Sequence, residues 1–209
     1  MTVLNKIAYF QNTRNEIPNQ KLAKELVETR NRDGIKEIVG NLWHKNKSVQ
    51  SDCLKVLYEI GYLAPELIAD YVNEFLALLK NKNNRLVWGS MIALSTIARL
   101  KADRIWSHID DVISTTENGS VITVVNGVKV LAGVASTQQV YNEKVLPVLL
   151  NIVETCIPRD VATHAESMLV MINDSNRGEF LNVLKAREQE MTSKSHITRL
   201  NKVYKKFVE

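Results

Sequence analysis

The sequence contains few of the residues that make tight turns or covalent cross-links. Among its 209 residues there are eight glycines and four prolines, which is too few for the many turns of a β-sandwich and favours helices. The two cysteines, Cys53 and Cys156, lie far apart and match no C-x-x-C spacing. We therefore expect two free, mostly buried thiols in a reducing cytosol, with a disulfide or a reactive thiol as the alternatives.

Long apolar runs are also missing. No stretch approaches the roughly 18 apolar residues that a membrane span needs, and the N-terminal residues have no apolar core of the signal-peptide type. We expect a cytoplasmic protein without a membrane partner. The net charge of +4 permits contact with an acidic partner, but it is smaller than that of a dedicated nucleic-acid-binding protein.

Catalytic and metal-binding signatures are absent from the sequence. There is no glycine-rich phosphate loop and no G-x-S-x-G motif, and the four histidines are scattered without zinc-site spacing. Asp110 and Asp111 are adjacent, so a helix would point them in different directions, which is the wrong spacing for a shared acid–base site. The sequence predicts a protein that is not an enzyme, with no cofactor, no metal and no small-molecule substrate.

The sequence does contain a repeat with a period of 37 residues. Segments 56–61 (VLYEIG), 93–98 (ALSTIA) and 130–135 (VLAGVA) follow one another at this spacing. A fixed period of this size is typical of a helical-repeat solenoid.

The register of the repeat can be followed through the first helix of each unit. Twelve positions recur at steps of 37 and all are apolar: Ile35, Val72, Ile109, Leu146; Ile38, Phe75, Val112, Leu149; Val39, Leu76, Ile113 and Leu150. Within each unit they fall at i, i+3 and i+4, which is one face of an α-helix.

The second helices align in the same way. The aligned residues are Leu57, Leu94 and Leu131, and then Ile60, Ile97 and Val134. For the fourth unit we predict one extra residue in the turn at 156–160, which would place Leu169 and Ile172 in these positions. Small residues between the bulky ones allow neighbouring helices to approach closely.

The turns lie where the period requires them. Asparagine and serine at 46–48, 82–84 and 118–120 are expected N-caps of the second helices, and Pro147 is expected to kink the fourth unit's first helix. We divide the chain into an N-terminal cap (1–32), four repeats (33–174) and a C-terminal cap (175–209). The C-terminal cap should hold helices at 177–190 and 195–208, whose polar outer faces would keep a solenoid soluble.

Two segments resemble the HEAT family of armadillo-like helical repeats. Residues 145–154 (VLPVLLNIVE) resemble its proline-bearing first helix, and residues 84–98 (NRLVWGSMIALSTIA) resemble its second helix. The resemblance covers about residues 33–174. It implies an all-α fold, a right-handed α-α superhelix of about five antiparallel helix pairs, which binds macromolecules along its surface.

We expect the chain to be a non-catalytic scaffold or adaptor that binds a protein partner along the concave layer of second helices. Aromatic and arginine side chains dominate the energetics of such surfaces. Removal of the core positions leaves the following candidates: Lys55, Tyr58, Tyr62, Trp88, Ile92, Arg99, Val125, Lys129, His164 and Ser167. The alternative for Trp88 and Ile92 is burial against the neighbouring repeat.

A second functional hypothesis rests on Trp106 and Asp110. They stand four residues apart on one face of a helix, and by the repeat register this face lies outside the core. The pair is similar to one in helical-repeat DNA glycosylases that remove alkylated bases, where the aromatic contacts a cationic base and the carboxylate stabilises developing positive charge. This resemblance implies a nucleic-acid-binding protein as the alternative.

Overall fold

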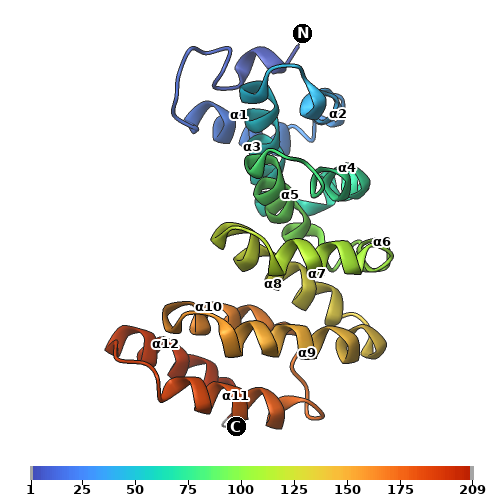
Figure 1. Cartoon of the computed structure of the whole chain (residues 1–209). Helices are drawn as coiled ribbons and strands as arrows, with labels where there is room; N and C mark the ends of the chain where they lie inside the picture. The colour runs from blue at the N-terminus through green and yellow to red at the C-terminus, as the bar shows by residue number, and fades with distance from the viewer. Residues whose placement is uncertain (1, 208–209) are drawn as a thin grey trace.

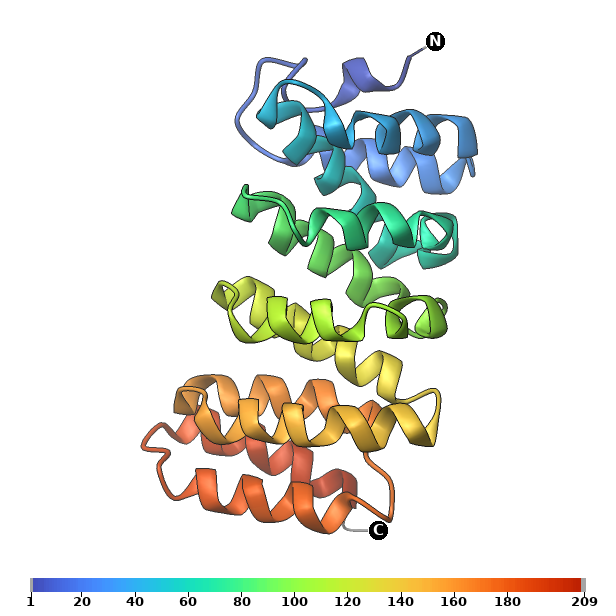
Figure 2. The ribbon, with the colours of Figure 1, turned by 45° about the vertical axis from the view of Figure 1, so that its right-hand side comes forward.

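The structure is a computed structural model that describes residues 2–207, and in this part of the chain all regular secondary structure is helical. The helices stack in pairs from the N-terminus to the C-terminus, so that the two ends of the chain lie at opposite ends of the stack, as Figure 1 and Figure 2 show. The expected α-α superhelix is confirmed.

Five helix pairs follow one N-terminal helix. The first helices of the pairs are α2 (Arg32–Gly40), α4 (Val72–Leu78), α6 (Ala102–Trp106) with α7 (Ile109–Glu117), α9 (Gln139–Thr155) and α11 (Arg177–Glu188). The second helices are α3 (Lys47–Leu63), α5 (Asn84–Ile97), α8 (Val121–Ala135), α10 (Pro158–Met168) and α12 (Lys194–Tyr204). The N-terminal helix α1 (Ile17–Glu28) packs on α3 and extends the row of second helices by one.

The second helices begin where the sequence period places them. Helices α3, α5, α8 and α10 start 37 residues apart. The side chains of Asn46, Asn83 and Ser120 each accept a hydrogen bond from a backbone N–H in the first turn of the helix that follows. In α10 the equivalent N-cap position is Ile157, which makes no side-chain cap, and Pro158 follows it in the first turn of the helix, where its missing N–H costs nothing. The predicted caps are confirmed.

The extra residue predicted in the fourth unit is wrong. Met168 and Met171 are 0% and 3% exposed and lie 37 residues after Leu131 and Val134, whereas Leu169 and Ile172 are only partly buried. The turn at 156–160 needs no insertion because Pro158 fits the first helical position directly. The flexible methionine side chains fill the core positions that branched residues fill in the other units.

The apolar face of the first helices forms the core, as predicted. Eleven of the twelve aligned positions are buried, and the twelfth, Ile113, is partly buried and packs against the same core cluster. The first helices differ in continuity, because 3-10 helices at Pro65–Leu67 and Ala69–Tyr71 precede α4, and α6 is separate from α7. Helix α9 continues through Pro147, and the kink expected there stays a prediction.

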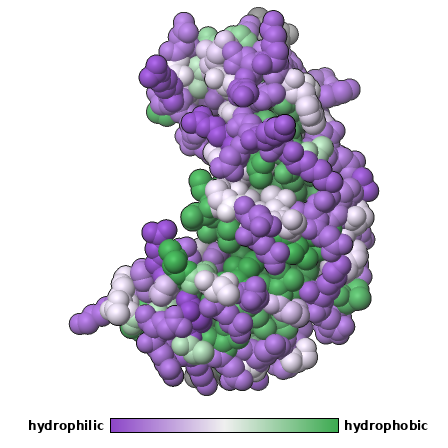
Figure 3. Space-filling view, viewed as in Figure 1, coloured by the Kyte–Doolittle hydropathy of each residue, from purple (hydrophilic) through white to green (hydrophobic). Residues whose placement is uncertain are grey.

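The second helices form the more closely packed layer. Each helix of this layer packs on the next one, in the order α1, α3, α5, α8, α10 and α12. Between first helices the main contacts are those of α4 with α6 and of α9 with α11. Glycine makes this approach possible: a Cβ on Gly61 of α3 would lie 2.3 Å from Thr96 Oγ1 of α5, and one on Gly133 of α8 would lie 2.8 Å from Ala98 Cβ. Because the tighter layer lies on the inside of a bend, the second helices line the hollow visible in Figure 3.

The two cysteines bear out the expectation of free thiols. Cys53 and Cys156 are both free, as expected, and burial raises the pKa of Cys53 to about 12 and that of Cys156 to about 11, so neither thiol is activated at neutral pH.

The C-terminal helices are shorter than predicted, with α11 ending at Glu188 and α12 at Tyr204 before a 3-10 turn at Lys205–Phe207. Val208, the predicted end of the last helix, and Glu209 lie outside the described residues.

The buried seam between repeats can be tested by truncation of Leu94, which is 0% exposed in α5. We expect Leu94→Ala to lower the free energy of unfolding by about 2–5 kcal/mol, because it removes buried contacts and leaves a cavity. The exposed Lys36→Ala on α2 should change it by less than about 0.5 kcal/mol. Urea denaturation followed by circular dichroism measures both, and equal effects of the two substitutions would contradict the proposed seam.

Candidate functional site

The candidate site is the exposed face of α3, α5, α8 and α10, which we call the inner surface. The 37-residue period places equivalent residues of neighbouring units side by side on it, because each second helix packs on the next. One such row contains Lys55, Ile92, Lys129 and Glu166. Figure 3 shows the hollow on this side, bordered by both hydrophobic and hydrophilic residues.

Aromatic rings lie together at the N-terminal end of the inner surface. The ring of Tyr58 lies 6.1 Å from that of Tyr62 and 6.3 Å from that of Trp88, centroid to centroid. Both distances are in the range of favourable aromatic pairs. Tyr62 is 56% exposed and Trp88 is half-buried, so this cluster presents part of its surface to solvent.

Lys55 is held in place beside this cluster. Its Nζ lies 2.9 Å from Glu16 Oε2, 2.7 Å from Glu59 Oε1 and 4.7 Å from the Tyr58 ring centroid. Burial disfavours the charge, but the hydrogen bonds to Glu59 and Glu16 outweigh it and raise the pKa of Lys55. The side chain is only 11% exposed. The expectation that Lys55 is displayed to a partner is therefore wrong, because two carboxylates already occupy its ammonium group.

Three other candidates are buried. Tyr58, Ile92 and His164 are 6%, 7% and 2% exposed, so the expectation that they project from the inner surface is wrong. The cause is the short distance between second helices, which covers side chains that a single isolated helix would expose. The alternative of burial against the neighbouring repeat is correct for Ile92 and partly so for Trp88.

The remaining candidates are accessible to different degrees. Tyr62, Arg99 and Lys129 are exposed, and Trp88, Val125 and Ser167 are half-buried. Arg99, Lys129 and Ser167 line one groove, Tyr62 and Trp88 lie beside Tyr58, and Val125 lines a different cavity. Their role in partner binding stays a prediction.

A groove crosses the inner surface from α5 over α8 to α10. Its volume is about 400 Å³, and Ala98, Gly133 and Val170 contribute the small and apolar part of its lining. Arg99, Lys129 and Glu166 contribute its charged part. Sequence reasoning missed Glu166 and Val170, although the period carries the signal: they follow Lys129 and Gly133 by 37 residues.

The charge of Glu166 is already neutralised. Arg199 of α12 binds it in a bidentate manner, with Nε 2.7 Å from Oε1 and Nη2 2.5 Å from Oε2. Two parallel charge-assisted hydrogen bonds of this kind are strong and fix the orientation of both groups. Neither Arg99 nor Lys129 forms an ion pair or side-chain hydrogen bond within residues 2–207.

A second cavity of about 340 Å³ lies between the start of α8 and the turn into α10. Val121 and Ile157 at its edge are 58% and 50% exposed, and His164 forms part of its lining. His164 Nδ1 is buried without a hydrogen-bond partner. Burial lowers the pKa of His164, with Asp160 acting weakly in the opposite sense, so the ring is neutral at pH 7.

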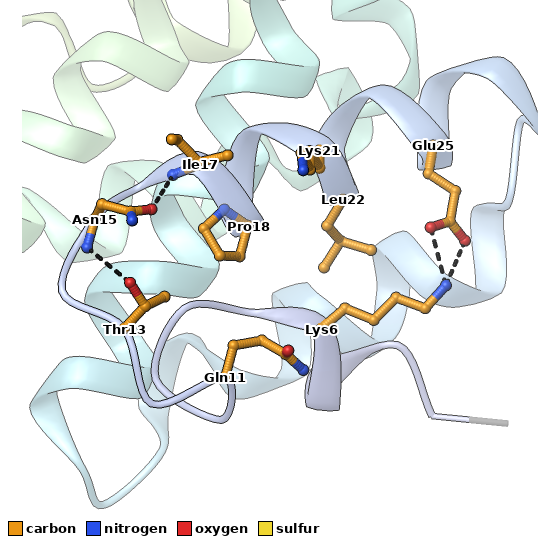
Figure 4. A pocket seen from close by; sticks show the side chains of 9 residues that line it. All are labelled: Lys6, Gln11, Thr13, Asn15, Ile17, Pro18, Lys21, Leu22 and Glu25. Carbon is orange, nitrogen blue, oxygen red and sulfur yellow. Dashed lines mark hydrogen bonds and ion pairs between the residues drawn. The ribbon is translucent and has the colours of Figure 1, made fainter.

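A further cavity, of about 520 Å³, lies between the N-terminal segment and α1. Figure 4 shows the Lys6 ammonium group bridging to the Glu25 carboxylate on one side of it, with Leu22 and Pro18 between them and the loop. The Nζ to Oε1 distance is 2.6 Å. Lys6 and Glu25 neutralise each other, and Lys21 is the one other charged residue of the lining, so we assign no site to this cavity.

The pair proposed for base excision has other partners. The Trp106 ring stacks on Tyr141 at 3.9 Å between centroids, and Asp110 binds Lys144 at 3.0 Å. Trp106 also packs against the core, so the expectation that it lies wholly outside it is wrong. These contacts link the third and fourth units, and no observation favours a flipped base at this position. The glycosylase alternative stays an untested prediction.

The remaining chemistry of the described residues is sparse. Within residues 2–207 no three His, Cys, Asp or Glu side chains are grouped as a metal site would require, and no helix has the length and apolar content to cross a bilayer.

Comparison with known proteins identifies the fold. No protein-family profile and no curated protein sequence matches the chain. Solved structures do match: an engineered protein with a TM-score of 0.64 at 14% identity covers 97% of this chain and 95% of its own. A designed armadillo repeat protein in complex with the peptide (KR)4 has a TM-score of 0.68 at 12% identity over 89% of this chain and 85% of its own.

A natural protein of the same architecture also matches. The karyopherin Kap121p bound to the SUMO protease Ulp1p has a TM-score of 0.66 at 12% identity, and the match covers 96% of this chain but 22% of the karyopherin. The chain therefore has an armadillo/HEAT-like helical-repeat fold. At these identities the likeness concerns the fold alone.

The neutral state of His164 predicts a pH dependence of stability. Because its pKa is lowered in the folded state, the unfolded chain binds more protons below an unfolded pKa of about 6.5, and stability is lost as the pH falls through this region. As the pH falls below about 6.5, the free energy of unfolding of the wild type should decrease relative to that of His164→Gln by at most about 1.4 kcal/mol per pH unit. Urea denaturation at several pH values measures this difference, and parallel curves for the two proteins would contradict it.

Proposed function

We propose that this chain, a solenoid of the armadillo/HEAT-like fold, is a non-catalytic scaffold or adaptor that binds an extended segment of a protein partner along its inner surface. The observation that carries the proposal is the continuity of that surface. Exposed Tyr62, half-buried Trp88 and the groove between Arg99 and Lys129 follow one another across consecutive repeats. No single catalytic constellation interrupts them in the described residues.

The composition of this surface supports binding. Tryptophan, tyrosine and arginine are the residues that contribute most to protein interfaces, and Trp88, Tyr62 and Arg99 are all at least partly accessible here. Four second helices packed at about 8–10 Å from one another span roughly 30 Å, which about nine or ten extended residues would cover. A short linear segment is therefore an occupant of suitable length.

The structural neighbours agree with this proposal. One of them is in complex with a peptide, and the karyopherin Kap121p occurs bound to a SUMO protease and, in another structure, to Pho4p. Binding of a polypeptide is thus a use to which similar folds are put. A cytoplasmic location stays a prediction of the sequence.

Site-specific photo-crosslinking tests the proposal. A benzoyl-phenylalanine residue in place of Tyr62 should capture protein partners from a lysate, because this exposed position lies next to the aromatic cluster. The same residue in place of Lys36, which is exposed on first helix α2, serves as the matched control. Mass spectrometry of the captured peptides should identify linear segments that are specific to the Tyr62 position.

Two outcomes would contradict the proposal. One is capture of the same proteins from both positions, which would indicate non-specific contact. The other is capture only from Lys36, which would move the binding surface to the first-helix layer.

A further inference from the structure

The charges in the groove between α5, α8 and α10 are unbalanced. Arg99 and Lys129 are exposed and unpaired within residues 2–207, and Arg199 lies at the α12 end. Against these three cations the groove contains one carboxylate, Glu166, which Arg199 already binds. A groove of this kind attracts anionic groups and disfavours cationic ones.

The carboxylates at the Lys55 end of the inner surface are not available to reverse this sign. Glu59 occupies the position 37 residues before Thr96, which lines the groove, but its Oε1 binds Lys55 Nζ at 2.7 Å. Glu16 binds the same ammonium group at 2.9 Å. The inner surface is therefore acidic and internally paired around Lys55, and basic and unpaired around Arg99 and Lys129.

The first-helix layer shows a different arrangement. There, cations of one unit bind carboxylates of the preceding unit: Lys101 binds Asp70 at 2.7 Å, and Lys144 binds Asp110 at 3.0 Å. Such ion pairs connect neighbouring repeats, and the paired side chains then have no free charge to offer to a partner. Arg99 and Lys129 also stand in neighbouring repeats, but they are of like charge and gain nothing from each other.

The lining of the groove restricts the shape of its occupant. Ala98 and Gly133 are buried where α5 meets α8, so the accessible part of the lining consists mainly of longer side chains such as Arg99, Lys129 and Val170. The hydroxyl group of Ser95 donates to the backbone carbonyl of Ile92 in its own helix at 2.7 Å, which leaves its oxygen atom as an acceptor. An extended backbone with N–H groups suits such a surface.

From these observations we infer that the occupant of the inner surface is an acidic extended peptide segment, with at least one carboxylate between Arg99 and Lys129 and an apolar or aromatic side chain beside Trp88 and Tyr62. The inference rests on the proposed function and specifies the chemistry of the partner. Single-stranded nucleic acid is the less suitable polyanion, because its phosphates repeat along the whole strand, whereas the unpaired cations identified on the inner surface, Arg99 and Lys129, are confined to the groove.

Fluorescence anisotropy with labelled peptides tests this inference on the full chain. The probe is a peptide of about ten residues in which Glu alternates with Leu and Tyr, a length that matches the inner surface. Three comparison probes are its twin with Gln for each Glu, its twin with Lys for each Glu, and oligo-dT of similar extended length. We expect the Glu peptide to bind with at least about tenfold higher affinity than the Gln and Lys twins, and to lose affinity as salt is added.

Charge reversal locates the binding. The double variant Arg99→Glu with Lys129→Glu should weaken binding of the Glu peptide at least about tenfold and should improve binding of the Lys twin. The matched control is Lys36→Glu with Lys185→Glu, two exposed lysines of first helices α2 and α11, which changes the net charge by the same amount. Equal thermal midpoints of both variants and the wild type establish that folding is unchanged.

The outcomes separate this inference from the proposed function. Equal affinity for the Glu, Gln and Lys peptides, with loss of binding on Trp88→Ala, would overturn the acidic specificity and leave peptide binding intact. Equal weakening by the control variant would overturn the assignment to Arg99 and Lys129. Binding of oligo-dT alone, or of no probe at all, would overturn both proposals.

Discussion

Close packing of the second helices is the constraint on which the rest of the structure depends. Gly61 and Gly133 lie at these contacts and have no side chain beyond hydrogen. One added carbon at either position would lie within 3 Å of the neighbouring helix. The first helices, with bulkier contacts and breaks before α4 and between α6 and α7, stay farther apart. This difference in spacing between the two layers produces the curvature and the hollow of Figure 3.

The same constraint decides which side chains can function. Tyr58, Ile92 and His164 lie at positions that would be exposed on a lone helix, but the neighbouring helix covers them. Tyr62 and Arg99, by contrast, are not covered by the neighbouring helix and remain exposed to solvent. The binding surface is therefore narrow, and its chemistry depends on a few residues in each repeat.

The fold could be predicted from the sequence because the repeat signal is redundant. Because the same apolar position recurs in four units, each unit gives separate evidence for the register of the repeat. The N-caps Asn46, Asn83 and Ser120 mark the same period independently. The one error in register arose where Met168 and Met171 replace branched residues, since methionine fills a core position without the pattern of its neighbours. Continuing the period without an insertion would have avoided it.

The site was predicted less well, because accessibility and charge pairing depend on contacts between distant residues. The partner of Lys55 includes Glu16, which precedes the repeats and follows no period. Glu166 is neutralised by Arg199, 33 residues away along the chain in the terminal helix α12. Periodicity identifies which positions face the same side, but it does not tell which charges are already satisfied.

Hydrogen–deuterium exchange of the unliganded chain, resolved by mass spectrometry, measures the packing of the two helix layers directly. The slowest-exchanging amides should lie in α3, α5 and α8, because these helices pack on neighbours on both sides and their backbone hydrogen bonds open only with the whole stack. The short helices α4 and α6 should exchange faster. Faster exchange in α5 and α8 than in α4 and α6 would contradict the account, because the second helices would then not form the closely packed layer.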